Sequence, residues 1–171
     1  MMANKFNVWG IWLNMLYIPE KNYLKILEYC KNHIPYEACG LAGGIKNGED
    51  WYIKKIYLLT NIESSTIHFT MDIIEQFAAV KDMRKNGLQM AGNFHSHPCA
   101  PAVLSEEDKR LAYDFNVSYM VLSLMDIMCP VLKAYKIDRE KNVTGEIIEI
   151  IKRNPTTSSY RNVEKSRRLW Q

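Results

Sequence analysis

The sequence predicts an α/β (α+β) domain in which one central mixed β-sheet is flanked by helices. Segments with the apolar patterns of strands alternate along the chain with segments of helical spacing, and no internal repeat or low-complexity stretch interrupts them. The chain has 171 residues, of which 47% are hydrophobic and 24% charged, as in a single globular domain with a substantial core. We therefore expect one functional site on one scaffold.

The first part of the chain mixes helical and strand patterns. In chain order we expect a strand ending near Ile18, a helix over 19–33, strands over 38–44 and 51–62, and a short extended segment over 65–72. Pro19 stands at an opening position of the helix, where its missing amide hydrogen costs nothing. Asn47 and Gly48 supply hairpin turn chemistry, so the two strands around them are expected to be neighbours.

A second helix is predicted over 73–86, with Gly87 after it as a typical C-terminal residue. Its apolar side chains share one face, as in an amphipathic helix; they are Ile73, Ile74, Phe77, Val80 and Met83. The remaining elements are a strand over 88–98, a helix from Ser105 to Asp114, and strands over 118–124, 131–137 and 146–151.

Cysteine usage and hydropathy indicate a cytoplasmic protein. The four cysteines form no C-x-x-C pair and do not resemble the framework of a small secreted domain, which favours a reducing compartment. The apolar stretch FNVWGIWLNMLYI is too short to span a bilayer and has no small-residue cleavage site after it. We interpret it as a strand preceded by extra residues, and expect no membrane partner.

Three parts of the chain differ in character: an N-terminal extension (1–14), the folded domain (15–151) and a basic C-terminal tail (152–171). The tail has six basic side chains and one acidic side chain, a net charge of +5, whereas the whole chain has +3. Aromatic residues do not alternate with these basic residues as they do in nucleic-acid-binding segments. We expect the tail to be solvated or to bind a partner other than nucleic acid.

The stretch HSHPCAPAVLSEED (95–108) contains a candidate zinc site. Residues two apart on a strand point to the same face, so His95 and His97 present both imidazoles together while Ser96 points away and orients the strand. Asp108 lies in the first turn of the helix that follows. Three protein ligands leave one tetrahedral position open, as in catalytic rather than structural zinc sites.

The second half of this stretch has a competing structural explanation. Ser105 and Asp108 have the spacing of a capping box, in which each side chain bonds the other residue's backbone at a helix start. A capping box does not account for the two histidines. Both interpretations can hold at once, because a capped helix start would fix Asp108 near them.

The stretch fits the pattern H-x-H-x(7)-S-x-x-D without a gap and resembles the JAMM (MPN+) metallopeptidases. PYEACGLAGG is similar to the segment of that family that carries a glutamate, here Glu37, and NIESSTIHFTMD resembles a further family segment. The resemblance covers about 15–138 and is closest to compact, prokaryotic-type, single-domain members. It implies a fold that resembles the cytidine-deaminase-like architecture.

The resemblance also implies the chemistry. One Zn²⁺ per chain would be bound by His95, His97 and Asp108, with Glu37 as the general base that activates the zinc-bound water. Ser105 would donate a hydrogen bond to the oxyanion, unless its hydroxyl is used only as a helix cap. The implied reaction is hydrolysis of the peptide or isopeptide bond after the C-terminal Gly-Gly of a ubiquitin-like or sulfur-carrier protein.

An extended Gly-Gly tail could pair with a wall of the cleft, and we expect that wall in the segment from Asn61 to Phe69. The candidate substrate-binding residues there are Asn61, Ser64, Ser65 and Thr66. His33 and His68 have no ligand partner at useful spacing and are expected to be ordinary surface or strand residues. Cys99 follows His97 closely and is either a reactive thiol near the metal or a small loop residue.

Three other functions are weighed against the peptidase. A non-catalytic scaffold or binding module of the same fold would not need the intact set of Glu37, His95, His97 and Asp108. A DNA-repair-associated relative is favoured only if the basic tail binds DNA. A zinc deaminase would need H-x-E and C-x-x-C motifs, which this chain lacks. No oligomeric state is predicted.

Overall fold

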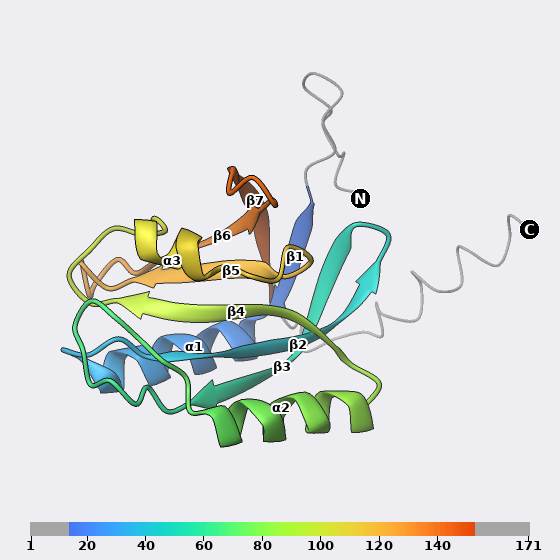
Figure 1. The fold of residues 1–171 in the computed structure, drawn as a ribbon, viewed down its shortest axis with the longest axis horizontal. Helices are drawn as coiled ribbons and strands as arrows, with labels where there is room; N and C mark the ends of the chain where they lie inside the picture. The colour runs from blue at the N-terminus through green and yellow to red at the C-terminus, as the bar shows by residue number, and fades with distance from the viewer. Residues whose placement is uncertain (1–13, 153–171) are drawn as a thin grey trace, which may run out of the picture.

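The computed structural model describes residues 14–152. Ten elements follow one another in this range (Figure 1). They are β1 (Met15–Pro19), α1 (Glu20–His33), β2 (Cys39–Asn47), β3 (Asp50–Leu59), α2 (Ile73–Lys85), β4 (Gln89–His97), α3 (Glu106–Leu111), β5 (Ser118–Ser123), β6 (Val131–Ile137) and β7 (Val143–Ile151). The predicted N-terminal extension and basic tail lie almost entirely outside the described residues and stay predictions.

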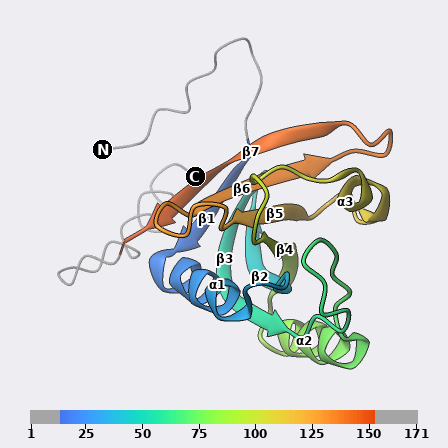
Figure 2. The same cartoon turned by 90° about the vertical axis from the view of Figure 1, so that its left-hand side faces the viewer.

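All the strands belong to one strongly curled mixed sheet (Figure 2). Their order is β1-β3-β2-β4-β5-β6-β7, and β1 also pairs with β7, so the sheet closes into a barrel. The pairs β1–β3, β1–β7 and β4–β5 are parallel, and the others are antiparallel. The predicted central mixed sheet with flanking helices is confirmed. The expected likeness to the cytidine-deaminase architecture stays a prediction.

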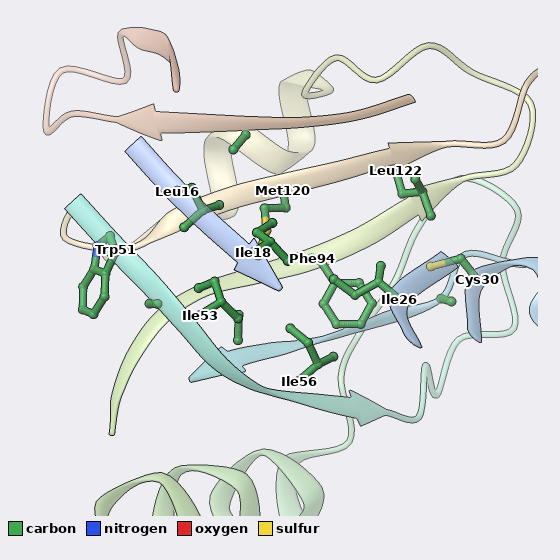
Figure 3. Packing of buried hydrophobic residues seen from close by; sticks show 14 of the residues in the cluster. Leu16, Ile18, Ile26, Cys30, Trp51, Ile53, Ile56, Phe94, Met120 and Leu122 are labelled. Carbon is green, nitrogen blue, oxygen red and sulfur yellow. The ribbon is translucent and has the colours of Figure 1, made fainter. Parts of the chain in front are cut away.

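The main core fills the inside of the curled sheet. Phe94 from β4 and Met120 from β5 are fully buried there, and Ile26 and Cys30 of α1 pack against them (Figure 3). Gly40 of β2 makes room for the Phe94 ring, because a Cβ at this position would come within 2.5 Å of it. The inner face of β4 is therefore committed to packing.

Two separate segments cover the outer face of the sheet: α2 covers one part, and the segment that contains α3 covers the other. Successive side chains of a strand alternate between faces, so Leu41 of β2 points away from the main core and packs with Ala79 and Met83 of α2. Val121 of β5 lies on the same outer face, under the segment that contains α3. Since β4 pairs with both β2 and β5, its outward side chains lie between the two covers.

The predicted apolar face of α2 is partly wrong. The helix has the expected spacing, but Ile73, Ile74 and Phe77 are 73%, 77% and 73% exposed, whereas Ala79 and Met83 are buried. A small residue at the contact allows the helix axis to approach the sheet closely, and the larger side chains are left on the solvent side. Apolar spacing alone does not distinguish these two faces.

Several boundaries also differ from the predictions. The strand expected over 51–62 ends at Leu59, and the helix expected to reach Asp114 ends at Leu111, because the chain turns into an extended conformation at the buried Ala112. The last strand begins at Val143, three residues earlier than expected. Among the described residues, none of the helices has the length and apolar character needed to cross a bilayer.

The core makes a direct prediction about stability. Phe94→Ala is expected to lower the free energy of unfolding by about 3–5 kcal/mol, because it removes a fully buried ring and leaves a cavity. Phe77→Ala makes the same chemical change at an exposed position and should stay within about 0.5 kcal/mol of the parent. Urea denaturation of both variants measures the difference; equal effects would contradict this assignment of the core.

Candidate metal centre

The two histidines of the motif lie at the end of β4, on its outward face. His95 pairs with Cys39 of β2 and with Val121 of β5, so its side chain points into the gap between the two covers of the sheet. His95 is 2% exposed and His97 is 7% exposed. Ser96 points to the opposite face and is fully buried, as the strand alternation predicts.

The structure brings the ligand atoms of His95, His97 and Asp108 within 4.8 Å of one another. The Nε2 atoms of the two histidines are 3.1 Å apart, and Asp108 Oδ2 is 3.5 Å from Nε2 of His95 and 3.9 Å from Nε2 of His97. Ligands about 2.0–2.2 Å from a tetrahedral zinc ion are roughly 3.3–3.6 Å from one another. The donor set and its spacing therefore fit one zinc ion.

A backbone contact sets the tautomer of His97. Its Nδ1 lies 2.8 Å from the carbonyl oxygen of Pro101, which can only accept a hydrogen bond. Nδ1 must therefore carry the proton and donate it, which leaves the lone pair of Nε2 facing the cluster. Burial, with a smaller contribution from the charge of His95, lowers the pKa of His97 and favours the neutral ring that binds metal.

Asp108 is held by the capping box that the sequence predicted. The backbone N–H and the hydroxyl of Ser105 both donate to Asp108 Oδ2, each at 2.7 Å, and the Asp108 N–H donates to Ser105 Oγ at 3.1 Å. Burial would raise the pKa of Asp108, but His95 and the hydrogen bonds from Ser105 outweigh it and hold that pKa well below its usual range. The helix cap thus also orients an ionised carboxylate toward the histidines.

The hydroxyl of Ser105 has one proton, and it donates that proton to Asp108 Oδ2. To donate to a substrate carbonyl instead, the hydroxyl would have to rotate away from Asp108. The predicted oxyanion role is therefore a second use of a hydroxyl whose first use is the helix cap.

Glu37 lies between the turn over 34–36 and the start of β2, on the same side as the histidines, and is 4% exposed. Its Oε1 is 3.9 Å from Nε2 of His97. Burial, partly offset by the charge of His95, raises the pKa of Glu37 to about 7. A carboxyl group that titrates near neutrality can both accept and release a proton, as a general base must.

Ser96 fixes Glu37 relative to the metal ligands. Ser96 Oγ accepts a hydrogen bond from the Ala38 N–H at 2.9 Å, and the Ser96 N–H donates to the Ala38 carbonyl oxygen at 2.9 Å. Ala38 follows Glu37 directly, so the two contacts hold the chain that carries the carboxylate against β4. This agrees with the predicted structural role of Ser96.

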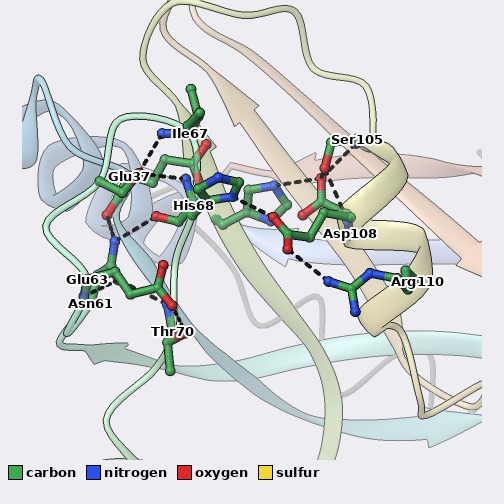
Figure 4. Close-up of polar contacts among 12 residues, drawn as sticks. Glu37, Asn61, Glu63, Ile67, His68, Thr70, Ser105, Asp108 and Arg110 are labelled. Carbon is green, nitrogen blue, oxygen red and sulfur yellow. Dashed lines mark hydrogen bonds and ion pairs between the residues drawn. The ribbon is translucent and has the colours of Figure 1, made fainter.

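The site opens into a cleft of about 470 Å³ between α3 and the loop over 60–72 (Figure 4). Its apolar lining comes from both sides and includes Ile67, Phe69, Leu104 and Leu111. The segment predicted to form the substrate wall thus lies beside the cleft. The residues of this segment and its continuation that line the cleft are Glu63 and 67–71. Ser64, Ser65 and Thr66 are not among the lining residues, and the Asn61 side chain bonds backbone atoms of its own surroundings.

Two features of this loop were not predicted. The Phe69 ring stacks on the His95 ring, with centroids 4.6 Å apart and planes at 21°. His68, expected to be an ordinary residue, contacts the Glu107 carboxylate of α3 through its Nδ1 and so joins the two sides of the cleft. No local sequence pattern predicts either contact, because each joins segments that are distant in sequence.

Cys99 is exposed and Cys39 is buried, as expected for a strand residue.

Known proteins share this fold and sequence pattern. The family described as prokaryotic homologs of the JAB domain matches residues 19–138. A curated relative, the desampylase of Pyrococcus furiosus, is 29% identical over 93 residues, which are 54% of this chain and 63% of the relative. The chain thus matches less than two thirds of that relative's length.

Two solved structures are similar over most of the chain. A protein from Desulfitobacterium hafniense, solved in solution, is 43% identical with a TM-score of 0.75, covering 82% of this chain and 96% of that one. A protein from Salinibacter ruber, also solved in solution, is 21% identical with a TM-score of 0.59, covering 84% and 95%. The second similarity concerns the fold alone.

The geometry predicts which histidine matters for metal binding. His97→Ala should weaken zinc affinity by more than the roughly 10–100-fold that loss of an outer hydrogen-bond partner costs, because it removes a direct ligand. His33→Ala changes a histidine on α1 that bonds the Tyr29 carbonyl and should bind zinc like the parent. Competition with a chromophoric chelator measures both affinities; equal affinities for the two variants would exclude this site.

Proposed function

The chain belongs to the family of prokaryotic homologs of the JAB domain, and from this membership and the geometry of the cleft we propose that it is a zinc-dependent metallopeptidase. The membership confirms the predicted relation to compact JAMM (MPN) proteins. The observation that carries the proposal is one buried carboxylate, Glu37, next to three converging ligand atoms in an open cleft.

Zinc bound by His95, His97 and Asp108 would supply Lewis-acid chemistry, polarising a carbonyl group and making water more acidic. The protein's own residues have separate tasks. Glu37 accepts a proton from the attacking water and passes it to the leaving nitrogen, for which its buried position and raised pKa are suited. Because Glu37 is buried, few solvent molecules can take that proton in its place.

Ser105 is proposed to stabilise the oxygen of the scissile carbonyl by a hydrogen bond from its hydroxyl. One such donor contributes about 2.7–4 kcal/mol of transition-state stabilisation in other hydrolases. This role requires the hydroxyl to leave Asp108 Oδ2 while the backbone N–H of Ser105 keeps its bond to that oxygen. The helix cap then loses only one of its contacts.

We propose a ubiquitin-like or sulfur-carrier protein as the substrate, with cleavage after its C-terminal Gly-Gly. The curated relative named desampylase supports a deconjugating activity. The cleft supports an extended, thin substrate, because both its sides approach the ligands and are joined by His68 and Glu107. Glycine side chains take no space and let a backbone reach a recessed site. The free cysteines are consistent with action in the cytoplasm.

The proposal predicts a strict dependence on Glu37. Zinc-loaded protein should remove an extension placed after Gly-Gly of a ubiquitin-like or sulfur-carrier protein, as read by intact mass, and a chelator should stop the reaction. Glu37→Gln is expected to lower kcat by about 10²–10⁴-fold, since the amide cannot accept the proton. Lysine-linked and linear extensions, tested side by side, distinguish isopeptidase from processing activity.

Glu49→Gln is the matched control, because Glu49 is exposed and pairs with Lys46 far from the cleft. It should retain the parent rate. Absence of cleavage for every fusion would instead favour a binding module of the same fold. Equal cleavage by Glu37→Gln and the parent would rule out the proposed base.

A further inference from the structure

Asn61 uses its whole side chain to organise the loop beside the cleft. Its Nδ2 donates to the carbonyl oxygens of Glu37 at 2.9 Å and His68 at 3.1 Å (Figure 4). Its Oδ1 accepts from the N–H groups of Glu63 at 3.1 Å and Thr70 at 3.0 Å. An asparagine amide has two donor hydrogens and two acceptor lone pairs, so its capacity is used in full. None is left for a substrate.

These bonds connect both arms of the loop with the segment that carries the base. The loop is closed at its foot by a bridge between Asn61 and Met71 and by the Ile62 N–H bonded to the Thr70 carbonyl. Asn61 then ties the arms to each other near their centre, at Glu63 and at His68 and Thr70. The same side chain reaches out of the loop to Glu37.

The loop holds the backbone of Glu37 on both sides. The Glu37 N–H donates to the Ser65 carbonyl at 2.8 Å, and its carbonyl accepts from Asn61. Glu37 lies before the start of β2, so these two groups are not part of the strand ladder. With Ser96 fixing Ala38, the contacts from the loop hold the backbone from which the Glu37 carboxylate projects.

We propose that Asn61 is the positioning residue for Glu37, coupling the wall of the cleft to the base, rather than a contact for the substrate. The inference rests on the proposed function for its kinetic consequence. The loop also carries Phe69, which stacks on the ligand His95, so the Asn61 contacts help to set the positions of both the base and a ligand ring. The cleft wall is thereby built before any substrate enters.

Asn61→Asp is the sharpest substitution. It keeps the size of the side chain and its acceptor oxygen for Glu63 and Thr70, but replaces the donor by a second oxygen that faces two carbonyl groups. We expect kcat to fall by about 10–100-fold with KM changed less than about 3-fold, since small displacements of a catalytic group cost rates of this order. Asn61→Ala, which loses all four bonds, should lower kcat at least as much.

A readout that does not need activity accompanies the kinetics. Amide hydrogen exchange of the Glu37 N–H should speed up at least about 10-fold in Asn61→Asp, because its acceptor Ser65 belongs to the released loop. The control is Asn142→Ala, which removes a similar side-chain bond, from Nδ2 to Asp138 Oδ2 in the distant β6–β7 turn. That variant should change neither kcat nor exchange at Glu37.

The two readouts separate the possible failures. Unchanged kcat and a raised KM in Asn61→Asp would overturn the positioning role and favour contact with substrate. Unchanged exchange at Glu37 would overturn it even if the parent shows no hydrolysis. Faster exchange in Asn61→Asp than in the parent, when the parent itself cleaves no fusion, would uphold the coupling and reject only the proposed activity.

Discussion

The pairing of β2 with β4 is the interaction on which the rest of the site depends. Ala38 and Ser96 are 58 residues apart, yet the hydroxyl and backbone of Ser96 hold Ala38 through two hydrogen bonds. This register places Cys39 opposite His95 and leaves Glu37 beside His97. A slip of one residue would turn one strand's side chains to the other face, and the carboxylate would no longer lie beside the imidazoles.

The groups that build the fold at this point also prepare its chemistry. The capping box that starts α3 aims Asp108, the Pro101 carbonyl sets the tautomer of His97, and the barrel interior holds the other face of β4 through Phe94. These residues also lower the stability of the fold, because burying polar groups such as Glu37 and the two histidines costs desolvation free energy. Strand ends and a capped helix are rigid supports, which suits a site that needs fixed geometry.

Local patterns predicted the parts of the site that are local. The alternation of β4 predicted that His95 and His97 share a face, and the Ser105–Asp108 spacing predicted the capping box. The place of Glu37 came only from the resemblance to a family, because nothing nearby in sequence pairs β2 with β4. The closed barrel, the exposed face of α2 and the contact of His68 with Glu107 depend on distant segments, so the sequence pattern did not predict them.

A crystal structure of the zinc-loaded protein, with anomalous diffraction at the zinc edge, would locate the metal and identify its ligands. We expect one zinc ion about 2.0–2.2 Å from Nε2 of His95, Nε2 of His97 and a carboxylate oxygen of Asp108. Glu37 should remain beside the ion without binding it. A zinc ion bound elsewhere, or bound by Glu37 in place of one of these ligands, would rule out this metal centre.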